Sequence, residues 1–363
     1  MRVLVAPDKF AGTLTAVEAA EAIAMGWRRR APDDELDLAP MADGGPGFVD
    51  VMHAALGGDL HVVTVEAVHG EQVPATILRV GAVAYVESSQ SCGLNLLQEA
   101  GGGAEFASTS GVGDLVLAAV DGGATTVVIG LGGSGTNDGG AGLLAALGAT
   151  SDGILDCGAI ALDTVRSVDL GPARERLAGV DLVMASDVDN PLTGLFGATK
   201  TYGPQKGIVD DRIAVVDAVL EQYAVAVDRR MSLEKGAGAA GGLGFALLCL
   251  GARREPGIEL VATAVRLTER ARAADLVITG EGAFDFSSRS GKVPYGVAEI
   301  AAHAMRPCIA LAGQVLVGSR EMRALGVESA YSLVDLVGEE RAFADPSGAL
   351  AELAERVART WSR

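Results

Sequence analysis

Acidic residues follow several short apolar segments of the chain, at the points where these segments end. The positions are Asp8, Asp43, Asp138, Asp187 and Glu281, with Asp285 shortly beyond, and three of their loops are rich in glycine. A single Asp-Gly pair at such a place usually forms only a turn or a helix cap. Several carboxylates brought together repel one another unless a cation neutralises them, and glycine N–H groups can bind an anion. The combination predicts a Mg²⁺–nucleotide site.

The motifs of the common nucleotide-binding folds do not account for this pattern. Gly291-Lys292 is followed by Val293 and lacks the upstream glycine of a P-loop. A G-x-G-x-x-G string occurs at 236–241, but the segment before it is polar, so close backbone packing is the favoured interpretation there. No histidine lies in a glycine-rich loop, so Ser-His-Asp and Cys-His chemistry have no support. Phosphoryl transfer needs only positioning, Mg²⁺ and a base for the acceptor hydroxyl.

Composition limits the partners and the compartment. The chain has 29 Lys+Arg against 47 Asp+Glu, a net charge of -18, which argues against nucleic acid or an anionic membrane as a partner. The four cysteines form no C-x-x-C pair, which favours a reducing compartment. The apolar start at residues 3–6 is too short for a signal peptide, and no apolar run approaches the ~20 residues of a membrane span. We therefore expect a cytoplasmic protein.

Strand and helix patterns alternate at both ends of the chain. The run Arg2 to Ala6 is typical of a buried parallel strand. Thr15 and Glu18 form a capping-box pattern before an amphipathic stretch that ends at Arg30. Between His61 and Ser88 the pattern changes to that of antiparallel strands. Further strands are expected at 36–41, 125–130, 181–186, 275–279, 307–312 and 329–333, and further helices at 47–56, 113–121, 140–147, 211–227, 293–304, 319–325 and 348–361.

A chain of 363 residues is long enough for two domains. The last three strands resemble the first two in length and composition. The economical topology therefore places residues 1–60 and 268–363 in one Rossmann-like, doubly wound parallel sheet, and residues 61–267 in an inserted mixed α/β domain. A simple division into an N-terminal and a C-terminal half is the alternative.

The motifs together resemble the bacterial glycerate kinase family, the two-domain kind that phosphorylates D-glycerate with ATP. The resemblance covers nearly the whole chain and is carried by 6–10 (APDKF), 42–45 (ADGG), 130–142 (GLGGSGTNDGGAG), 187–192 (DVDNPL), 202–207 (YGPQKG), 236–244 (GAGAAGGLG), 278–282 (ITGEG) and 291–294 (GKVP). It implies a discontinuous Rossmann-like domain with an inserted domain, and glycerate bound between them. It also implies that lysines within the motifs offset the acidic charge locally.

On this resemblance we expect an ATP-dependent glycerate kinase that uses Mg²⁺ and has a small-molecule substrate. The catalytic candidates are Asp187, Asp8 and Lys9, and either carboxylate is a candidate to activate the hydroxyl, while Asp187 and Glu281 are the metal candidates. The substrate candidates are Asp43, Lys292 and Asp285. The candidates for binding nucleotide and phosphate are Gly132, Gly133, Ser134, Thr136, Asn137, Asp138, Gly280, Glu281 and Gly282.

Four positions depart from the family pattern and keep alternatives open. Pro46 and Phe48 replace a carboxylate and a hydroxyl of the usual DGGEGT, and Ala283 stands where an arginine is frequent. Asp189 likewise occupies a place where threonine is common. A kinase for another small hydroxy acid and a non-catalytic nucleotide or metabolite sensor are therefore the alternatives. The 2-hydroxyl is favoured over the 3-hydroxyl as acceptor only by the resemblance, and the oligomeric state is open.

Overall fold

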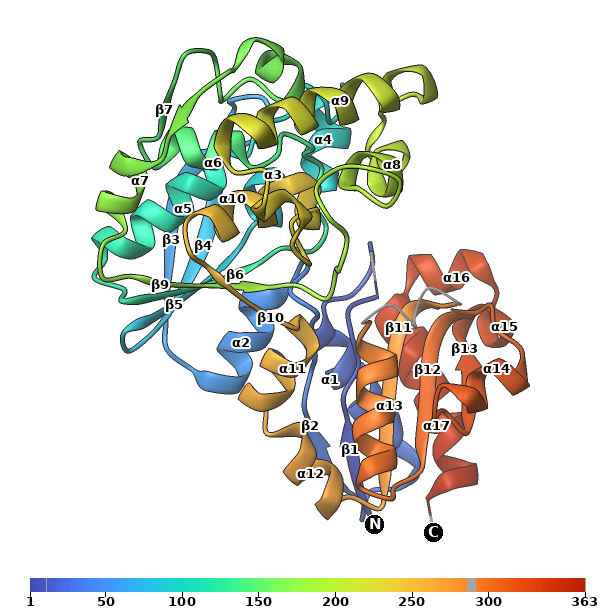
Figure 1. Ribbon diagram of the computed structural model, residues 1–363. Helices are drawn as coiled ribbons and strands as arrows, with labels where there is room; N and C mark the ends of the chain where they lie inside the picture. The colour runs from blue at the N-terminus through green and yellow to red at the C-terminus, as the bar shows by residue number, and fades with distance from the viewer. Residues whose placement is uncertain (11, 286–291, 363) are drawn as a thin grey trace. The chain divides into compact units, whose positions relative to one another are not determined.

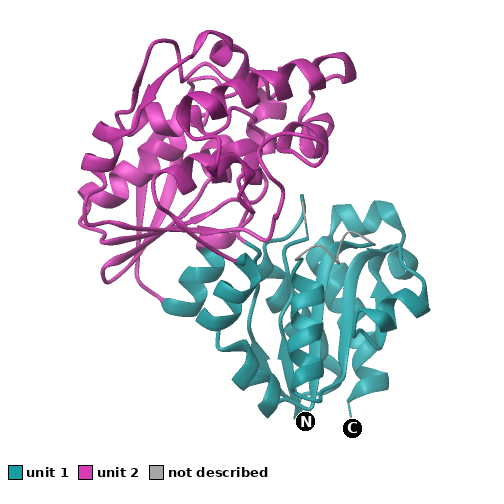
Figure 2. Ribbon diagram, viewed as in Figure 1, with its two compact units in different colours: residues 1–43, 50–56, 256–363 teal, residues 44–49, 57–255 magenta. Residues whose placement is uncertain are grey.

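The computed structural model describes residues 1–10, 12–285 and 292–362. The chain divides into two compact units, which Figure 2 colours separately. The first unit contains residues 1–43, 50–56 and 256–363, and the second contains residues 44–49 and 57–255. The sequence predicts boundaries near residues 60 and 267, whereas the chain divides at Leu56 and Glu255. We propose that the units are the two expected domains, with the second boundary moved to this earlier position.

The first unit is built on a five-stranded sheet in the order β13-β12-β11-β1-β2, and all its strand pairs are parallel. Its strands are β1 (Arg2–Val5), β2 (Glu35–Leu38), β11 (Leu276–Phe284), β12 (Cys308–Val315) and β13 (Ser329–Ser332). The strand order reverses between β1 and β11, which is the switch point of a doubly wound fold. Because crossovers between parallel strands are right-handed, the helices after β1 and after β11 cover opposite faces of the sheet.

Helices surround this sheet, and three of them begin at a side chain that caps the helix N-terminus. They are α1 (Ala16–Arg30), α2 (Phe48–Leu56), α11 (Gly257–Ala264), α12 (Leu267–Ala273), α13 (Val293–His303), α14 (Ser319–Ala324), α15 (Leu333–Val337), α16 (Glu339–Ala344) and α17 (Pro346–Trp361) (Figure 1). The Thr15–Glu18 capping box is confirmed, since each residue's side chain accepts a hydrogen bond from the other's backbone N–H. Gly26 allows α1 to approach α17, because a Cβ there would collide with the Ala351 carbonyl oxygen.

The second unit is built on a six-stranded mixed sheet in the order β10-β9-β6-β5-β4-β3. Strands β3 (Asp59–Glu66), β4 (Gln72–Val80) and β5 (Val83–Glu87) pair in antiparallel fashion, as predicted. Strands β6 (Thr126–Gly130), β9 (Asp181–Ala185) and β10 (Arg253–Glu255) continue the sheet in parallel from β5. A separate two-stranded sheet joins β7 (Thr150–Ser151) to β8 (Val168–Asp169).

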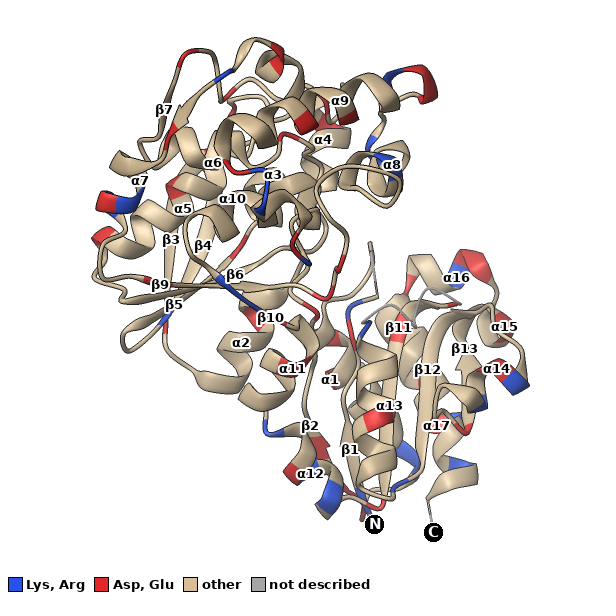
Figure 3. Ribbon diagram, in the orientation of Figure 1, with Lys and Arg blue, Asp and Glu red and all other residues tan. Residues whose placement is uncertain are grey.

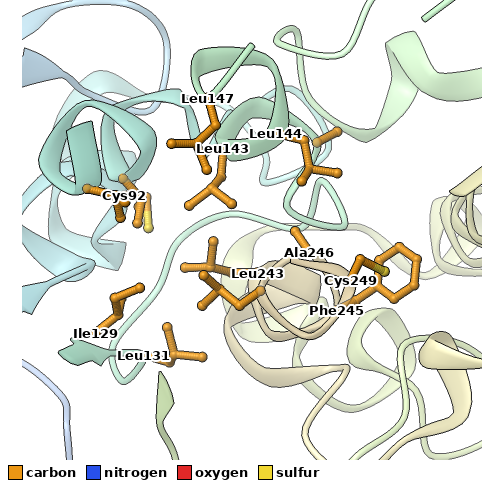
Figure 4. Close-up of a cluster of buried hydrophobic side chains, with 14 of the residues drawn as sticks. Cys92, Ile129, Leu131, Leu143, Leu144, Leu147, Leu243, Phe245, Ala246 and Cys249 are labelled. Carbon is orange, nitrogen blue, oxygen red and sulfur yellow. The ribbon is translucent and has the colours of Figure 1, made fainter. Parts of the chain in front are cut away.

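The helices of the second unit pack on an apolar core that is formed largely by leucine, valine and alanine. In Figure 4, Leu143 from one helix lies near Leu243 from another, with Ile129 of β6 on the same side of the cluster as Leu131. The helices are α3 (Ser89–Cys92), α4 (Leu94–Ala100), α5 (Ser110–Asp121), α6 (Ala141–Ala146), α7 (Gly171–Arg176), α8 (Ala198–Tyr202), α9 (Asp210–Val227) and α10 (Leu243–Cys249), with short 3₁₀ turns at 159–164, 204–206, 231–233 and 239–242.

Three features of the fold differ from the sequence prediction. Strand β11 continues to Phe284, so Gly280–Gly282 lies inside a strand instead of following one. The cause is the long pairing with β12, which extends to Phe284 opposite Val315. Strand β2 ends at Leu38, and the additional helices are α3, α4, α7, α8, α10, α11, α12, α15 and α16. Within the described residues, no helix combines the length and the apolar character needed to cross a bilayer.

Candidate functional site

The segments after β1 and β2 and the last part of β11 bring together several charged residues in the first unit. Figure 3 colours the Lys, Arg, Asp and Glu positions along the ribbon. The Asp8 N–H donates to the Gly280 carbonyl oxygen at 2.8 Å, which fixes the turn after β1 against β11. Asp8 Oδ1 accepts a hydrogen bond from the Lys9 N–H at 2.7 Å and lies 3.8 Å from Lys9 Nζ. Asp43 and Glu281 are close enough to affect the titration of Asp8. The predicted residues Asp8, Lys9, Asp43 and Glu281 are thus neighbours.

The environment of Asp8 changes its acidity. Burial raises its pKa to about 7, and the negative charges of Asp43 and Glu281 act in the same direction. The Lys9 ammonium and the Lys9 N–H both act to lower the pKa, but burial has the larger effect. A carboxylate that titrates near neutral pH is suited to accept a proton from a substrate hydroxyl. Asp8 therefore has the properties of a general base.

Lys292 extends this cluster along β11. It lies at the N-terminal end of α13, and its Nζ is 3.8 Å from Glu281 Oε2 and 3.9 Å from Asp285 Oδ1. Lys9 and Lys292 therefore supply two positive charges among four carboxylates. Such lysines can bind the carboxylate or phosphate of a small anion in a protein whose overall charge repels it.

The second unit contains the glycine-rich loop of residues 131–140, which follows β6. Its first glycines approach the segment 44–47 closely. The Gly132 N–H donates to the Gly44 carbonyl oxygen at 3.0 Å, and a Cβ on Gly132 would lie 2.5 Å from Gly45 Cα. Gly133 has a φ of +73°, and a Cβ there would lie 2.6 Å from Pro46 Cδ. Glycine is therefore required at these positions by backbone packing.

A buried lysine holds the middle of the glycine-rich loop. Lys206 is 4% exposed, and its Nζ donates to Ser134 Oγ and to the Thr136 carbonyl oxygen, each at 2.8 Å. Because the peptide bond is trans, a Thr136 carbonyl that points towards Lys206 directs the Asn137 N–H away from it. Lys206 thus sets the direction in which the loop presents its donors.

Several backbone donors of this loop have no acceptor within the described chain. The hydrogen bonds among residues 1–10, 12–285 and 292–362 do not use the N–H groups of Gly133, Ser134, Thr136 or Asn137. Gly133 is also exposed. Successive free N–H groups in a glycine-rich loop form the kind of concave surface that binds phosphate. The loop is therefore suited to bind an anion through its backbone.

The side chains of Asp138 and Asn137, the last two candidates in this loop, are buried and form hydrogen bonds within the protein. Asp138 is fully buried, and its carboxylate accepts hydrogen bonds from the Thr109 N–H and hydroxyl and from the N–H groups of Gly140 and Gly142, at 2.8 to 3.2 Å. It therefore ties the start of α5 to the start of α6. Burial raises its pKa, although these hydrogen bonds act in the opposite direction. Asn137 is also buried, and its Nδ2 donates to Thr199 Oγ1 at 2.9 Å. We therefore propose that these two side chains hold the loop in place, while its backbone N–H groups bind phosphate.

The segment after β9 carries the remaining catalytic candidate. Asp187 is half-buried and follows Ser186 at the strand end. Asp189 does not share this role, because it forms ion pairs with Lys235 at 3.1 Å and with Arg254 at 2.7 Å. The Lys235 hydrogen bond and the Arg254 charge lower the pKa of Asp189. Asp187 lies in the second unit and the other metal candidate, Glu281, in the first.

Sequence reasoning overlooked Glu87, which ends β5 in the same way that the other acidic residues end their strands. Its Oε2 accepts from the Gly47 N–H at 2.9 Å, next to the start of α2, and Ser89 Oγ donates to its Oε1 at 2.5 Å. A carboxylate at a helix N-terminus is favoured by the helix dipole. The same pattern, a carboxylate at the end of a strand, could have identified Glu87, but this residue lies in the region that was predicted as antiparallel strands.

The departures at positions 46 and 48 are accommodated by packing. The Pro46 ring occupies the space beside Gly133. Phe48 is fully buried, and its ring lies 6.2 Å from that of Tyr85 in an edge-to-face arrangement. Ala283 lies within β11, opposite Gln314. The changes at positions 46 and 48 therefore strengthen the apolar contacts around the loop.

The described residues contain no group of three His, Cys, Asp or Glu side chains placed to hold a metal ion. The chemistry of the cluster around Asp8 nevertheless fits Mg²⁺, because its candidate ligand atoms are carboxylate oxygens and two of these carboxylates raise the pKa of Asp8. Mg²⁺ usually needs only one or two protein carboxylates when a nucleotide supplies the other oxygens. The residues present are thus compatible with a metal ion that arrives with phosphate.

Comparison with known proteins gives one consistent result. The model of the glycerate kinase family matches residues 3–362. Glycerate 2-kinase of Escherichia coli strain K12 is 38% identical over 349 residues, which cover 93% of this chain and 92% of the relative. Glycerate kinase of Bacillus subtilis strain 168 is 38% identical over 371 residues, which cover 99% and 96%.

A solved structure agrees with these relatives. The crystal structure of a protein assigned as glycerate kinase 2 in Salmonella typhimurium LT2 has a TM-score of 0.81 and 36% identity, and the match covers 99% of this chain and 98% of that one. The predicted fold class and the prediction of a kinase are confirmed at the level of the family. On the full-length family match and on relatives of this identity, the chain belongs to the glycerate kinase family.

Proposed function

We propose that the protein transfers the γ-phosphoryl group of ATP to a hydroxyl of D-glycerate, with 2-phosphoglycerate as the favoured product. The observation that carries this proposal is the position of Asp8, a buried carboxylate with a pKa near 7 beside Lys9 and near Glu281. The names of the relatives, among them a glycerate 2-kinase, support the substrate and the acceptor position. The same proposal includes a cytoplasmic location.

In this proposal each group of described residues has a separate role in the reaction. The carboxylate of Asp8 accepts the proton of the acceptor hydroxyl, and the hydroxyl oxygen forms its bond to the γ-phosphorus as the bond to the bridging oxygen of ADP breaks. Lys9 and Lys292 bind the carboxylate of glycerate, and Asp43 and Asp285 bind its hydroxyl groups. The free N–H groups of the glycine-rich loop, which Lys206 orients, bind phosphate oxygens.

A metal ion has a limited part in this scheme. Asp187 and Glu281 are the candidates to hold Mg²⁺, which would neutralise phosphate charge when bound. Asp187 also stays as the alternative general base. Asp8 is favoured over Asp187 as the general base, because the charges of Asp43 and Glu281 help to raise its pKa towards the pH at which a base works best.

The direct test is turnover of D-glycerate with ATP and Mg²⁺, with ³¹P NMR to identify the product. We expect 2-phosphoglycerate and ADP in equal amounts. Asp8→Asn should lower kcat by about 10²–10⁴, the usual contribution of a general base. Asp33→Asn, which removes an exposed carboxylate of the same unit, is the matched control and should keep wild-type kcat.

The alternatives give different results in the same assay. Turnover of glycolate, lactate or L-glycerate in preference to D-glycerate would identify a kinase for another hydroxy acid. Binding of ADP without turnover of any of these acids would support a non-catalytic sensor, and would contradict the proposal.

A further inference from the structure

An uncharged cavity lies over the carboxyl ends of β11, β12 and β13 in the first unit. Its volume is about 230 Å³, and it is lined by residues from the last parts of β11 and β12, from the turn after β1 and from α15 to α17. We call it the base slot and define it by Phe10, Gly282, Gly313, Val334, Ala342 and Phe343. The carboxyl ends of parallel strands are where doubly wound domains bind their ligands. The base slot therefore has the location of a ligand site.

The floor of the base slot is bare backbone. Gly282 and Gly313 lie side by side on the paired strands β11 and β12. A Cβ on Gly313 would collide with the Gly282 carbonyl oxygen, so no side chain can be placed on this part of the sheet. A flat peptide surface without side chains leaves room for a planar group to lie against it.

The walls of the base slot are apolar, and one of them is an exposed aromatic ring. Phe10 and Ala342 are buried, whereas Phe343 on α16 is 61% exposed although it lines the cavity. A single exposed phenylalanine is common on protein surfaces, so the place of Phe343 in the cavity wall, and not its exposure, bears on ligand binding. An aromatic ring beside a flat cavity can stack on a planar heterocycle.

The polar side chains that line the base slot are uncharged. Gln314 lines the cavity, and an amide offers both donors and an acceptor. The Thr13 hydroxyl also lines the cavity and donates to the Phe10 carbonyl oxygen at 2.9 Å, which leaves its oxygen able to accept. None of the described lining residues is charged. The lining therefore suits a neutral ring with a donor-and-acceptor edge and does not suit phosphate or carboxylate.

The position of the base slot relates it to the charged cluster of the same unit. Phe10 directly follows Lys9, and Gly282 directly follows Glu281. The volume is smaller than the ~300–1,000 Å³ of sites for drug-sized ligands, and is appropriate for one ring system. A ligand with a planar neutral part and an anionic part could therefore use the same strand ends for both.

We propose that the base slot binds the purine base of the nucleotide substrate. This proposal rests on the proposed kinase function, which requires a nucleotide but does not locate its base. The ring lies on the Gly282–Gly313 floor, Phe343 covers it, and Gln314 contacts its polar edge.

The test compares ligands with and without a base. Binding of ADP, adenosine and tripolyphosphate is measured by calorimetry for the wild type, Phe343→Ala and Ala342→Leu. Stacking on an aromatic side chain contributes enough that Phe343→Ala should weaken ADP and adenosine by roughly 5–50-fold. Ala342→Leu should weaken both by filling the cavity, and tripolyphosphate affinity should stay within about twofold. Leu316→Ala removes another exposed apolar side chain of the first unit and is the control.

The outcomes separate this proposal from the kinase function. Unchanged ADP and adenosine affinity in both variants would overturn the base slot, as would an equal loss of tripolyphosphate binding. Glycerate turnover does not enter this comparison. If the wild type fails to phosphorylate glycerate and both variants lose adenosine affinity, the proposed reaction is refuted and the base slot is supported. In a folded protein that turns over glycerate, absence of the variant effects refutes the base slot alone.

Discussion

Substitution of Lys206 by methionine tests how the glycine-rich loop is held. Methionine keeps the length and the apolar stem of lysine but removes the ammonium that donates to Ser134 Oγ and to the Thr136 carbonyl oxygen. Burial lowers the pKa of Lys206 to about 8, although the nearby Cys92 and Asp138 act to raise it. Burial also raises the pKa of the Cys92 thiol to about 12, so the thiol is neutral at pH 8.

The effect on stability follows from the lowered pKa. In the unfolded chain Lys206 titrates near 10.5, so between pH 8 and 10.5 the unfolded state binds more protons, and folding becomes more favourable as pH rises. Below pH 8 the buried charge opposes folding by about 3 kcal/mol, the equivalent of this pKa shift. Two hydrogen bonds to a charged donor contribute about 1.5–3 kcal/mol each. Lys206→Met removes both effects, so we expect the free energy of unfolding at pH 7 to fall by about 0–3 kcal/mol, the difference between them.

The effect on activity is larger, because the loop loses its orientation. Without the ammonium, the buried Thr136 carbonyl has no donor, and a loop that turns to satisfy it misdirects the Asn137 N–H. Leaving such a group unsatisfied costs about 1–3 kcal/mol, so kcat/KM for ATP should fall by roughly 10–100-fold. Lys200→Met is the control, because the ammonium of Lys200 pairs with Asp217 of α9 at 2.9 Å and not with a residue of the loop.

The pH profile distinguishes this role from a general loss of packing. We expect wild-type kcat/KM to rise with pH through about 7, as Asp8 ionises, and to fall above about 8, as Lys206 loses its proton. In Lys206→Met the alkaline decrease should vanish and the acidic one should stay. An unchanged kcat/KM, or an alkaline decrease that persists in the variant, would refute the reasoning.

Three further results are expected. The pKa of Asp8 is raised from 3.8 to about 7, so this residue lowers the stability of the fold progressively as the pH rises between these values. Asp8→Asn should therefore raise the free energy of unfolding at pH 8 by a few kcal/mol (~1.4 per pKa unit) and should not raise it at pH 3. Urea titrations at the two pH values measure this difference. Gly133→Val should raise the KM for ATP more than tenfold, because the new side chain meets Pro46 and a φ of +73° is unfavourable for valine. Ser134→Ala should change this KM less than about fivefold. Equal effects of the two substitutions would show that the loop does not act through its backbone. Removal of divalent cations with excess chelator should abolish turnover, because the acidic cluster repels the triphosphate, and full activity in chelator would contradict that dependence.

Much of the fold could be predicted from the sequence because local patterns determine it. The non-alternating Val and Leu residues of β1 predict a strand that is buried on both faces, and Thr15 and Glu18 predict the start of α1. The antiparallel region was likewise visible in its alternation and turns. Each of these signals lies within a few neighbouring residues, where propensity and capping act.

The candidate site could be predicted only in its residue types. Acidic strand ends and glycine-rich loops are visible along the chain, and they identified Asp8, Lys9, Asp43 and the loop after β6. Their neighbours from distant segments are not visible in the same way. Lys206 reaches Ser134 across 72 positions in the sequence, and no local pattern predicts that this lysine is buried beside the loop.

The tertiary structure decided which of the similar residues can take part in chemistry. Asp8 and Asp138 both lie in loops near strand ends and both are buried, but hydrogen bonds from two helix starts occupy the carboxylate of Asp138, whereas Asp8 faces other charged groups. Likewise β11 continues through Glu281 because β12 pairs with it there. The sequence by itself thus determined the elements and the acidic, glycine-rich character of the loops, since these depend on short-range propensity. Burial, charge environment and hydrogen-bond occupancy depend on contacts between segments far apart in the chain, and only the folded structure sets these.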